Sequence, residues 1–283
     1  MTDITEIIAE IDTLKPIPPV AAQILVLAED INSSLSEIAD LIIHDPSITA
    51  NVLRLCNSAY FGLPRKVESV YDAITLLGLD HVVDLVLLDS LSCNFQDGGD
   101  GYGLGEGELW RHAVLSAHVV EILVEQAGLP VKKHLVFTAA LVKDIGKLIL
   151  GRFVAFSFEK INILVHSHGY SFNEAEKEVI GMNHEELGAL MAKNWGFSEK
   201  LIYIIQHHHL SDEAARDDRE TALVYLADIV CMMMGMSTGV DGLAYRFYSD
   251  VLNGMNLAAK DLQTVIAETG ESWEKIESLL NLV

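Results

Sequence analysis

The fold is decided by the stretch Ala139-Ala140-Leu141-Val142-Lys143-Asp144-Ile145-Gly146-Lys147-Leu148-Ile149-Leu150. It continues an apolar run that begins near Leu135 and is apolar on almost every side, which is typical of a helix in the middle of a fold. Desolvating an unpaired charge is expensive, so its charged side chains need partners. Asp144 and Lys147 are three residues apart and can pair on one helix face. Gly146 costs about 1 kcal/mol relative to alanine in a helix interior, which indicates close packing.

Two readings of the buried carboxylate remain open at this point. An Asp144–Lys147 pair with no further role would account for both charges. The alternative is that the carboxylate faces a bound cation, because a buried carboxylate in apolar surroundings needs a positive partner.

The segment Leu141-Val142-Lys143-Asp144-Ile145-Gly146-Lys147 resembles the L-x-H-D-I-G-K signature of the HD superfamily of metal-dependent phosphohydrolases. Lys143 stands where the superfamily has the histidine of its His-Asp pair. Further segments resemble the HDOD branch, the HD-related output domains of bacterial signalling proteins. These are Asp45-Pro46-Ser47-Ile48-Thr49, Leu53-Arg54-Leu55-Cys56-Asn57-Ser58-Ala59-Tyr60-Phe61-Gly62, and Leu109-Trp110-Arg111-His112. The resemblance covers roughly residues 15–235.

Helical signals recur along the whole chain. Capping boxes start at Ser34, Ser171 and Asn183, and Asp45 before Pro46 forms an N-cap followed by a first-turn proline. Period-two alternation persists nowhere, so no sheet is expected. We predict an all-α chain in two packed helical lobes, the second HD-like, with one helix over residues 131–150 that holds the central stretch. Residues 1–95 form the N-terminal lobe of the HDOD unit, and residues 108–283 form the HD-like lobe with its C-terminal helices.

Between the two predicted lobes, residues 96–107 form a glycine-rich linker. Glycines lose much entropy on ordering, and only Tyr102 and Leu104 could anchor the segment, so we expect it to be mobile. The sharper alternative is a phosphate-binding loop. The segment follows a helix and lacks the Lys-Ser/Thr ending of a P-loop, which argues against that alternative.

The composition narrows the classes of partner. With 19 basic and 41 acidic residues the net charge is −22, which opposes binding to nucleic acid or to an anionic membrane. Acidic residues interrupt the most apolar windows, so no membrane span is expected. The acidic first residues are unlike a secretory signal. Cys56, Cys93 and Cys231 lie apart and are interpreted as reduced core residues of a cytoplasmic protein.

The resemblance implies a metal site. The HD superfamily binds divalent metal through a histidine, the His-Asp pair and a later aspartate, and the matching positions are His112, Asp144 and Asp228. Lys143 alters this set, because an ammonium cannot coordinate a metal. Either Lys143 points away and leaves a weakened site, or its ammonium replaces the metal and pairs with the two aspartates.

Members with two metals add further histidines. The candidates here are His184, His207 and His208, and His209 is considered only because it adjoins two of them. Imidazole and carboxylate both suit first-row divalent metals. We expect no cofactor, and the alternative is a degenerate site that holds a divalent transition metal weakly.

Three functions remain open. The first, implied by the HDOD resemblance, is a non-catalytic signal-transduction module that binds a signalling protein, or alternatively a nucleotide. The second is a metal-dependent phosphohydrolase or phosphodiesterase, in which Asp144 and Lys147 would act in catalysis. The third is a sensor that binds a nucleotide without turnover. The sequence indicates no oligomeric state.

Overall fold

The computed structural model describes residues 4–15, 17–30, 32–92, 94–95, 100–236, 239–242 and 246–282. In these ranges all regular structure is helical, which confirms the all-α prediction. The α-helices are α1 (Ile4–Ala9), α2 (Pro19–Glu29), α3 (Leu35–His44), α4 (Pro46–Cys56), α5 (Val70–Leu77), α6 (Leu79–Ser92), α7 (Glu108–Ala127), α8 (Lys133–Val142), α9 (Lys147–His168), α10 (Phe172–Ile180), α11 (His184–Asn194), α12 (Glu199–His207), α13 (Arg219–Met233), α14 (Asp250–Gly254), α15 (Ala259–Glu271) and α16 (Trp273–Leu280). Short 3₁₀ helices are η1 (Glu10–Thr13), η2 (Asp100–Tyr102) and η3 (Glu213–Asp217).

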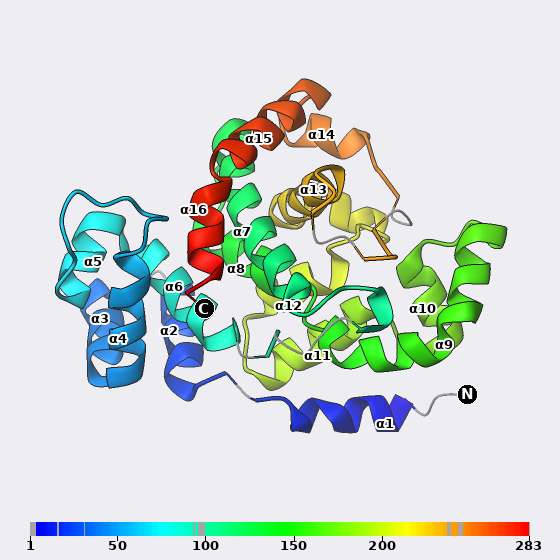
Figure 1. The fold of residues 1–283 in the computed structure, drawn as a ribbon, viewed down its shortest axis with the longest axis horizontal. Coiled ribbons are helices and arrows are strands. Elements are labelled where there is room, and N and C mark those ends of the chain that lie inside the picture. Colours follow the sequence, from blue (N-terminus) through cyan, green and yellow to red (C-terminus); the bar gives the residue numbers. More distant parts are fainter. Residues whose placement is uncertain are drawn as a thin grey trace.

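The helices form a bundle that is long in one direction (Figure 1). Helices α3, α4 and α5 stack at one end, and α9 and α10 extend to the other. Helix α7 lies in the middle and packs against α8 and α13, while α15 and α16 cover it. The centre of the molecule is therefore built from α7, α8 and α13. The boundaries of the two lobes stay a prediction.

Local sequence signals start several helices as expected. Capping boxes are present at Ser34, Ser171 and Asn183. The Asp45 carboxylate accepts hydrogen bonds from the backbone N–H groups of the second and third residues of α4, and Pro46 is the first helical residue. These caps satisfy backbone donors that a helix start leaves without partners.

The prediction of one continuous helix over residues 131–150 is wrong. Helix α8 ends at Val142, a tight turn covers residues 143–146, and α9 runs on to His168. The cause is a close approach of α11. An added Cβ on Gly146 would lie 2.0 Å from the backbone oxygen of His184. The signature thus lies on a corner between two helices, where glycine lets a neighbouring backbone come close.

The glycine-rich segment differs from the expectation of a mobile linker. Residues 96–99 lie outside the described residues. In the rest of the segment, Tyr102 is fully buried and Leu104 is 7% exposed. The backbone oxygen of Tyr102 accepts a hydrogen bond of 2.7 Å from Val240, and η2 packs against α9. Residues 101–104 are therefore packed against the core through Tyr102 and Leu104, contrary to the expectation of a linker without such contacts.

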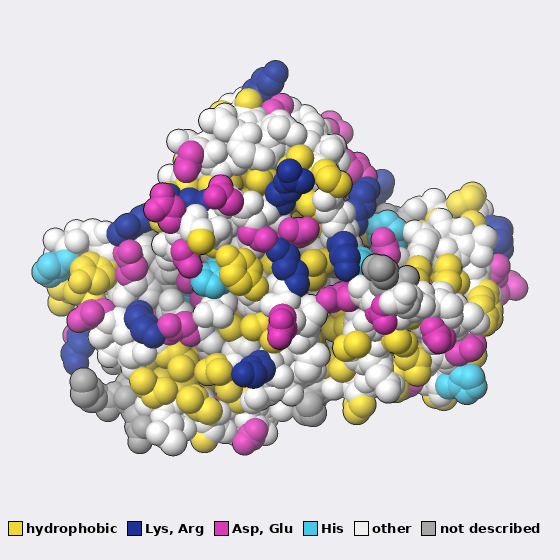
Figure 2. Space-filling view, turned by 180° about the vertical axis from the view of Figure 1, so that it is seen from behind, with side chains coloured by type: hydrophobic (Ala, Val, Ile, Leu, Met, Phe, Trp, Pro, Cys, Tyr) yellow, Lys and Arg dark blue, Asp and Glu magenta, His cyan; other side chains and the backbone are white. Residues whose placement is uncertain are grey.

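Other expectations concern the surface and the cysteines. Among the described residues no helix is both long and apolar enough to cross a membrane. Figure 2 shows one face on which acidic and basic side chains are interspersed, without a basic cluster. Cys56 and Cys231 are buried free thiols, as expected, and Cys93 lies outside the described residues.

Gly146→Ala tests the corner. The methyl group would collide with backbone, so we expect the free energy of unfolding to fall by about 1–3 kcal/mol, measured by urea denaturation. Gly270→Ala, in α15, is the matched control, because an added Cβ there meets nothing within 4 Å. It should stabilise the protein by about 0.5–1 kcal/mol. Equal stability of the two variants would contradict the close approach.

Candidate functional site

The corner between α8 and α9 brings three predicted residues together. His112 comes from α7 and Asp228 from α13, while Asp144 lies on the corner. All three are buried, and their ligand-type atoms lie within 4.8 Å of one another. The three residues therefore converge, as the resemblance implied, although His112 and Asp228 are 116 positions apart in the sequence. Their role as metal ligands stays a prediction.

Lys143 lies inside this group and is 1% exposed. Its ammonium forms an ion pair with Asp144, lies 2.6 Å from Asp228 Oδ1 and lies 3.1 Å from His112 Nε2. His112 Nε2 is also 2.8 Å from Asp228 Oδ1. The ammonium thus stands among the three groups that would hold a cation. Of the two outcomes left open by the sequence, the structure has the lysine pointing inward.

The charges in this group support one another. Burial raises the pKa of Asp144, but the ammoniums of Lys143 and Lys147 outweigh it and hold the pKa well below its usual range. Burial also opposes the charged form of Asp228, yet Lys143 keeps the pKa of Asp228 well below its usual range. Burial lowers the pKa of Lys143, and the two carboxylates reverse this and raise it. Lys143 and the two carboxylates are therefore charged near neutral pH, with opposite charges in contact.

Lys147, the first residue of α9, extends the network. Its ammonium lies 2.9 Å from Asp144 Oδ1, as the three-residue spacing predicted, and 2.7 Å from Asp241 Oδ2. It also lies 5.2 Å from the centre of the Tyr102 ring. Asp241 and Tyr102 were missed by the sequence reasoning. Neither adjoins the motif, although Tyr102 was noted as an anchor of the glycine-rich segment.

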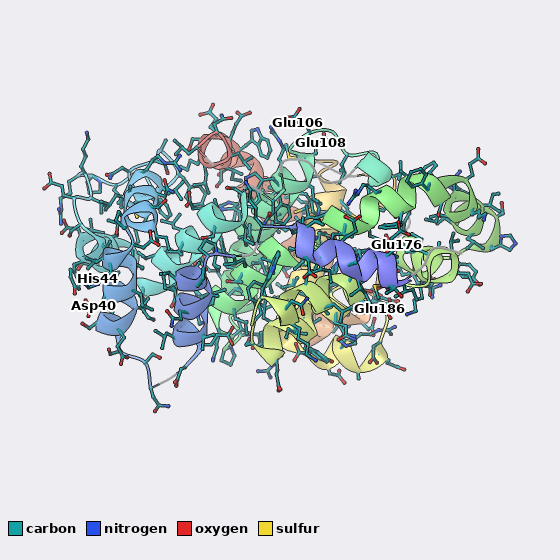
Figure 3. All side chains as sticks on the ribbon, turned by 90° about the horizontal axis from the view of Figure 1, so that it is seen from below. Asp40, His44, Glu106, Glu108, Glu176 and Glu186 are labelled. Atoms are coloured by element: carbon teal, nitrogen blue, oxygen red, sulfur yellow. The ribbon has the colours of Figure 1, made fainter. Side chains whose placement is uncertain are left out.

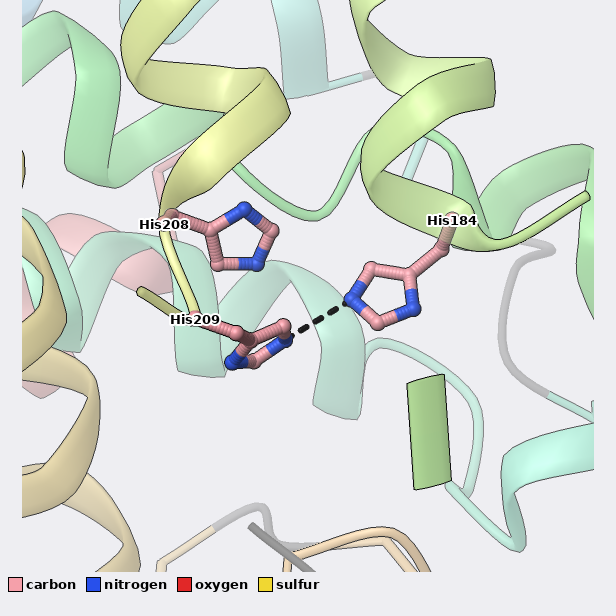
Figure 4. A group of neighbouring side chains, drawn as sticks. All are labelled: His184, His208 and His209. Atoms are coloured by element: carbon pink, nitrogen blue, oxygen red, sulfur yellow. Dashed lines mark hydrogen bonds between the residues drawn. The ribbon is translucent and has the colours of Figure 1, made fainter. Parts of the chain in front are cut away.

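A histidine cluster, drawn in Figure 4, lies next to Asp144. It consists of His184, the first residue of α11, with His208 and His209, which follow α12. His184 Nε2 lies 2.9 Å from His209 Nε2. Asp144 Oδ1 is 3.9 Å from His184 Nε2 and 3.8 Å from His208 Nε2. Lys143, His112, Asp144 and Asp228 are called the lysine group below. Asp144 therefore contacts the other members of the lysine group and also faces the histidine cluster.

Neighbouring groups fix the orientation of these rings. Glu176 Oε2 lies 2.7 Å from His184 Nδ1, and Tyr102 donates a 2.5 Å hydrogen bond to Glu176 Oε1. His208 Nδ1 lies 2.8 Å from the backbone oxygen of Ile205, which requires a proton on Nδ1 and leaves a lone pair on Nε2. Burial lowers the pKa of His208 to about 3, so its ring is neutral. Such outer partners are typical of metal-binding histidines.

The two halves of the site differ in their fit to a metal. The group of His112, Asp144 and Asp228 does not fit a divalent ion, because the Lys143 ammonium stands among its ligand atoms. In the histidine cluster burial lowers the pKa values of His208 and His209, whereas Glu176 outweighs burial and raises the pKa of His184. His208 Nε2 is a buried atom without a hydrogen-bond partner among the described residues. That donor set suits a first-row transition metal.

One predicted ligand is not brought to the site. His207, the last residue of α12, is half-buried, and its ring packs against Tyr203 at 4.5 Å between centres. His209 joins the cluster in its place. Glu176, labelled in Figure 3, was also missed by the sequence reasoning; it lies on α10 and is fully buried. Its position eight residues before His184 places it in the preceding helix, so no local spacing could reveal the contact.

Asp144→Ala tests the buried charge group. It would leave the Lys143 and Lys147 ammoniums with one carboxylate partner fewer, and breaking a buried pair typically costs about 3–5 kcal/mol. We expect a loss of that size in the free energy of unfolding, measured by urea denaturation. Asp72→Ala is the control, because its surface pair with Arg65 is exposed and should contribute less than about 1 kcal/mol. A similar small loss in both variants would argue against the group's structural role.

Several solved protein structures have a fold similar to that of this chain. The structure of an HDOD domain protein of unknown function from Geobacter sulfurreducens is 23% identical to this chain, with a TM-score of 0.73 over 99% of both chains. A protein from Marinobacter aquaeolei VT8, provisionally named a signal transduction protein, is 22% identical, with a TM-score of 0.75 over 95% of this chain and 60% of the other. A protein from Shewanella amazonensis SB2B, provisionally named a phosphohydrolase, is 20% identical, with a TM-score of 0.70 over 98% and 97%. These likenesses show the fold.

Sequence comparison adds the family. An uncharacterised protein of Treponema pallidum (strain Nichols) is 22% identical over 212 residues, and the match spans 74% of this chain and 40% of that protein. The HDOD domain family model matches residues 14–211, which include the lysine group's His112, Lys143 and Asp144 and the whole histidine cluster. The chain therefore belongs to the HDOD family.

Proposed function

We propose that this chain is a non-catalytic signal-transduction output module that acts by binding a partner protein. The observation that carries the proposal is the Lys143 ammonium among His112, Asp144 and Asp228. A phosphohydrolase of this superfamily would need a metal there to activate water and polarise a phosphoryl oxygen. The lysine supplies the positive charge without either of these capacities.

Lys143→His tests this point. The substitution restores an imidazole beside Asp144 and removes the ammonium, so we expect the variant to bind one more equivalent of Mn²⁺ or Zn²⁺ than the unaltered chain, counted by equilibrium dialysis. Lys160→His, an exposed position on α9, is the control and should add none.

The opposite result would restore the enzyme. In that case the unaltered chain would bind metal tightly and stoichiometrically and would hydrolyse a phosphodiester. Asp144→Ala would abolish both the metal binding and the hydrolysis.

The groove that we propose as the partner's site lies between α2, α3 and the end of α11. Its volume is about 740 Å³. The floor and walls are mostly apolar, and Val26 is 54% exposed there. Glu37 and Asp40 line the groove on α3, where Figure 3 shows Asp40 beside His44. An apolar groove with acidic residues suits an amphipathic helix that carries basic residues on its flank.

Val26→Asp tests the groove. A charge in its apolar wall should lower capture of the partner from a lysate of the native cell by at least about tenfold, because burying an unpaired charge is costly. Ile163→Asp is the matched control, since Ile163 is also 54% exposed but lies on α9. Capture measured by quantitative mass spectrometry should be unchanged in the control. Equal losses, or none, would exclude this groove as the partner site.

A metal-dependent phosphohydrolase is the second candidate function, and the histidine cluster favours it. His184, His208 and His209 with Asp144 would hold the ion. A metal bound there would supply a Lewis acid. The Lys147 ammonium, 2.9 Å from Asp144 Oδ1, opposes a second cation at that oxygen.

The third candidate function is a sensor that binds a nucleotide without turnover. Because the net charge of the chain is −22, the nucleotide's phosphates would need such a metal or the Lys147 ammonium as a positive partner.

A further inference from the structure

A separate cluster of titratable side chains lies where α6 meets α7. His81 and Asp84 are three residues apart on α6, and Glu121 faces them from α7. They line a cavity of about 270 Å³. None of these residues belongs to the lysine group or to the histidine cluster. The cavity therefore needs its own explanation.

The three side chains have the geometry of a ligand set. His81 Nδ1 lies 3.6 Å from Glu121 Oε1 and 4.0 Å from Asp84 Oδ2. One atom from each residue can be chosen so that all three lie within 4.8 Å of one another. The two distances from His81 Nδ1 are shorter than about 4.4 Å, which is twice an ordinary metal–ligand distance, so this nitrogen can share one ion with either carboxylate.

Asp84 gives an independent sign that a cation is needed. It is 4% exposed, it lines the cavity, and its Oδ1 atom has no hydrogen-bond partner among the described residues. Burial raises the pKa of Asp84 well above its usual range, and Glu121 adds to the effect. Burial also raises the pKa of Glu121 to about 7. The unpartnered Asp84 oxygen, in a cavity that Glu121 also lines, is the geometric sign that a cation is missing.

The surrounding charges leave the centre of the cavity free for an ion. Lys133 also lines the cavity, and its ammonium lies 3.5 Å from Glu125 Oε1, where both side chains are mostly exposed. On the inner side the Tyr60 hydroxyl lies 3.4 Å from Glu121 Oε2 and 2.9 Å from His118 Nδ1. Tyr60 therefore orients Glu121 and leaves its other oxygen toward His81.

We propose that His81, Asp84 and Glu121 bind a first-row divalent transition metal ion that joins α6 to α7. One imidazole and two carboxylates favour such an ion over Mg²⁺ or Ca²⁺, which prefer oxygen ligands alone. The His81 side chain is 47% exposed, so the ion has a route from solvent. Because α6 and α7 belong to different predicted lobes, the ion would link them.

The experiment is Zn²⁺ binding to the full chain after treatment with EDTA, measured by isothermal titration calorimetry. Asp84→Asn and Glu121→Gln should each weaken one equivalent of Zn²⁺ by more than about tenfold, since even outer partners of metal ligands contribute 10–100-fold. His208→Ala should leave that equivalent in place. Glu125→Gln, the control, removes the same charge from an exposed side chain in the same cavity and should change the affinity less than about threefold.

A second readout reports on the ligand itself. In the unaltered chain the ring nitrogens of His81, assigned by comparison with His81→Ala, should shift in NMR spectra on addition of Zn²⁺. The circular dichroism spectrum of each variant checks that it is folded, and two isosteric variants guard against failure of one. Absence of this equivalent in the unaltered chain, unchanged affinity in Asp84→Asn and Glu121→Gln, or an equal loss in Glu125→Gln would each overturn the proposal.

Discussion

The Lys143 ammonium is the charge on which the centre of this protein depends. It lies among Asp144, Asp228 and His112, and these groups come from the corner between α8 and α9, from α13 and from α7. Two carboxylates buried this deeply would repel each other without a cation. A buried pair contributes little net stability relative to an apolar core, but removal of one partner is costly, so the group holds three segments in a single arrangement.

Close packing at Gly146 determines what else Asp144 meets. Because the backbone at Gly146 lies against the start of α11, His184 is carried to within 3.9 Å of Asp144 Oδ1. The end of α12 adds His208 on the same side. Asp144 therefore has one oxygen toward Lys143 and the other toward Lys147 and the histidines. The same carboxylate links a group that contains its own cation to a cluster in which His208 Nε2 has no hydrogen-bond partner among the described residues.

Buried carboxylates occur both in the lysine group and in the cluster of His81, Asp84 and Glu121, but their surroundings differ in positive charge. At the corner, Lys143 and Lys147 are buried with the carboxylates and keep their pKa values low. At the meeting of α6 and α7, no buried ammonium lines the cavity of Asp84 among the described residues, and Lys133, which lines it, pairs with an exposed glutamate instead. A chain with a net charge of −22 has few cations to place inside, so where they are placed decides which carboxylates stay charged.

The sequence by itself determined the helical class, the caps that start α3, α4, α10 and α11, and the pairing of Asp144 with Lys147, because these depend on residues three or four positions apart. The resemblance located His112, Asp144 and Asp228. Only the tertiary structure decided that the central helix is interrupted by a turn at residues 143–146, that Lys143 points inward, and that Tyr102, Glu176 and Asp241 join the site. The tertiary structure likewise selected His209 over His207. These contacts join residues far apart in the chain, and their formation depends on how α9, α11 and α13 pack, which no local spacing encodes.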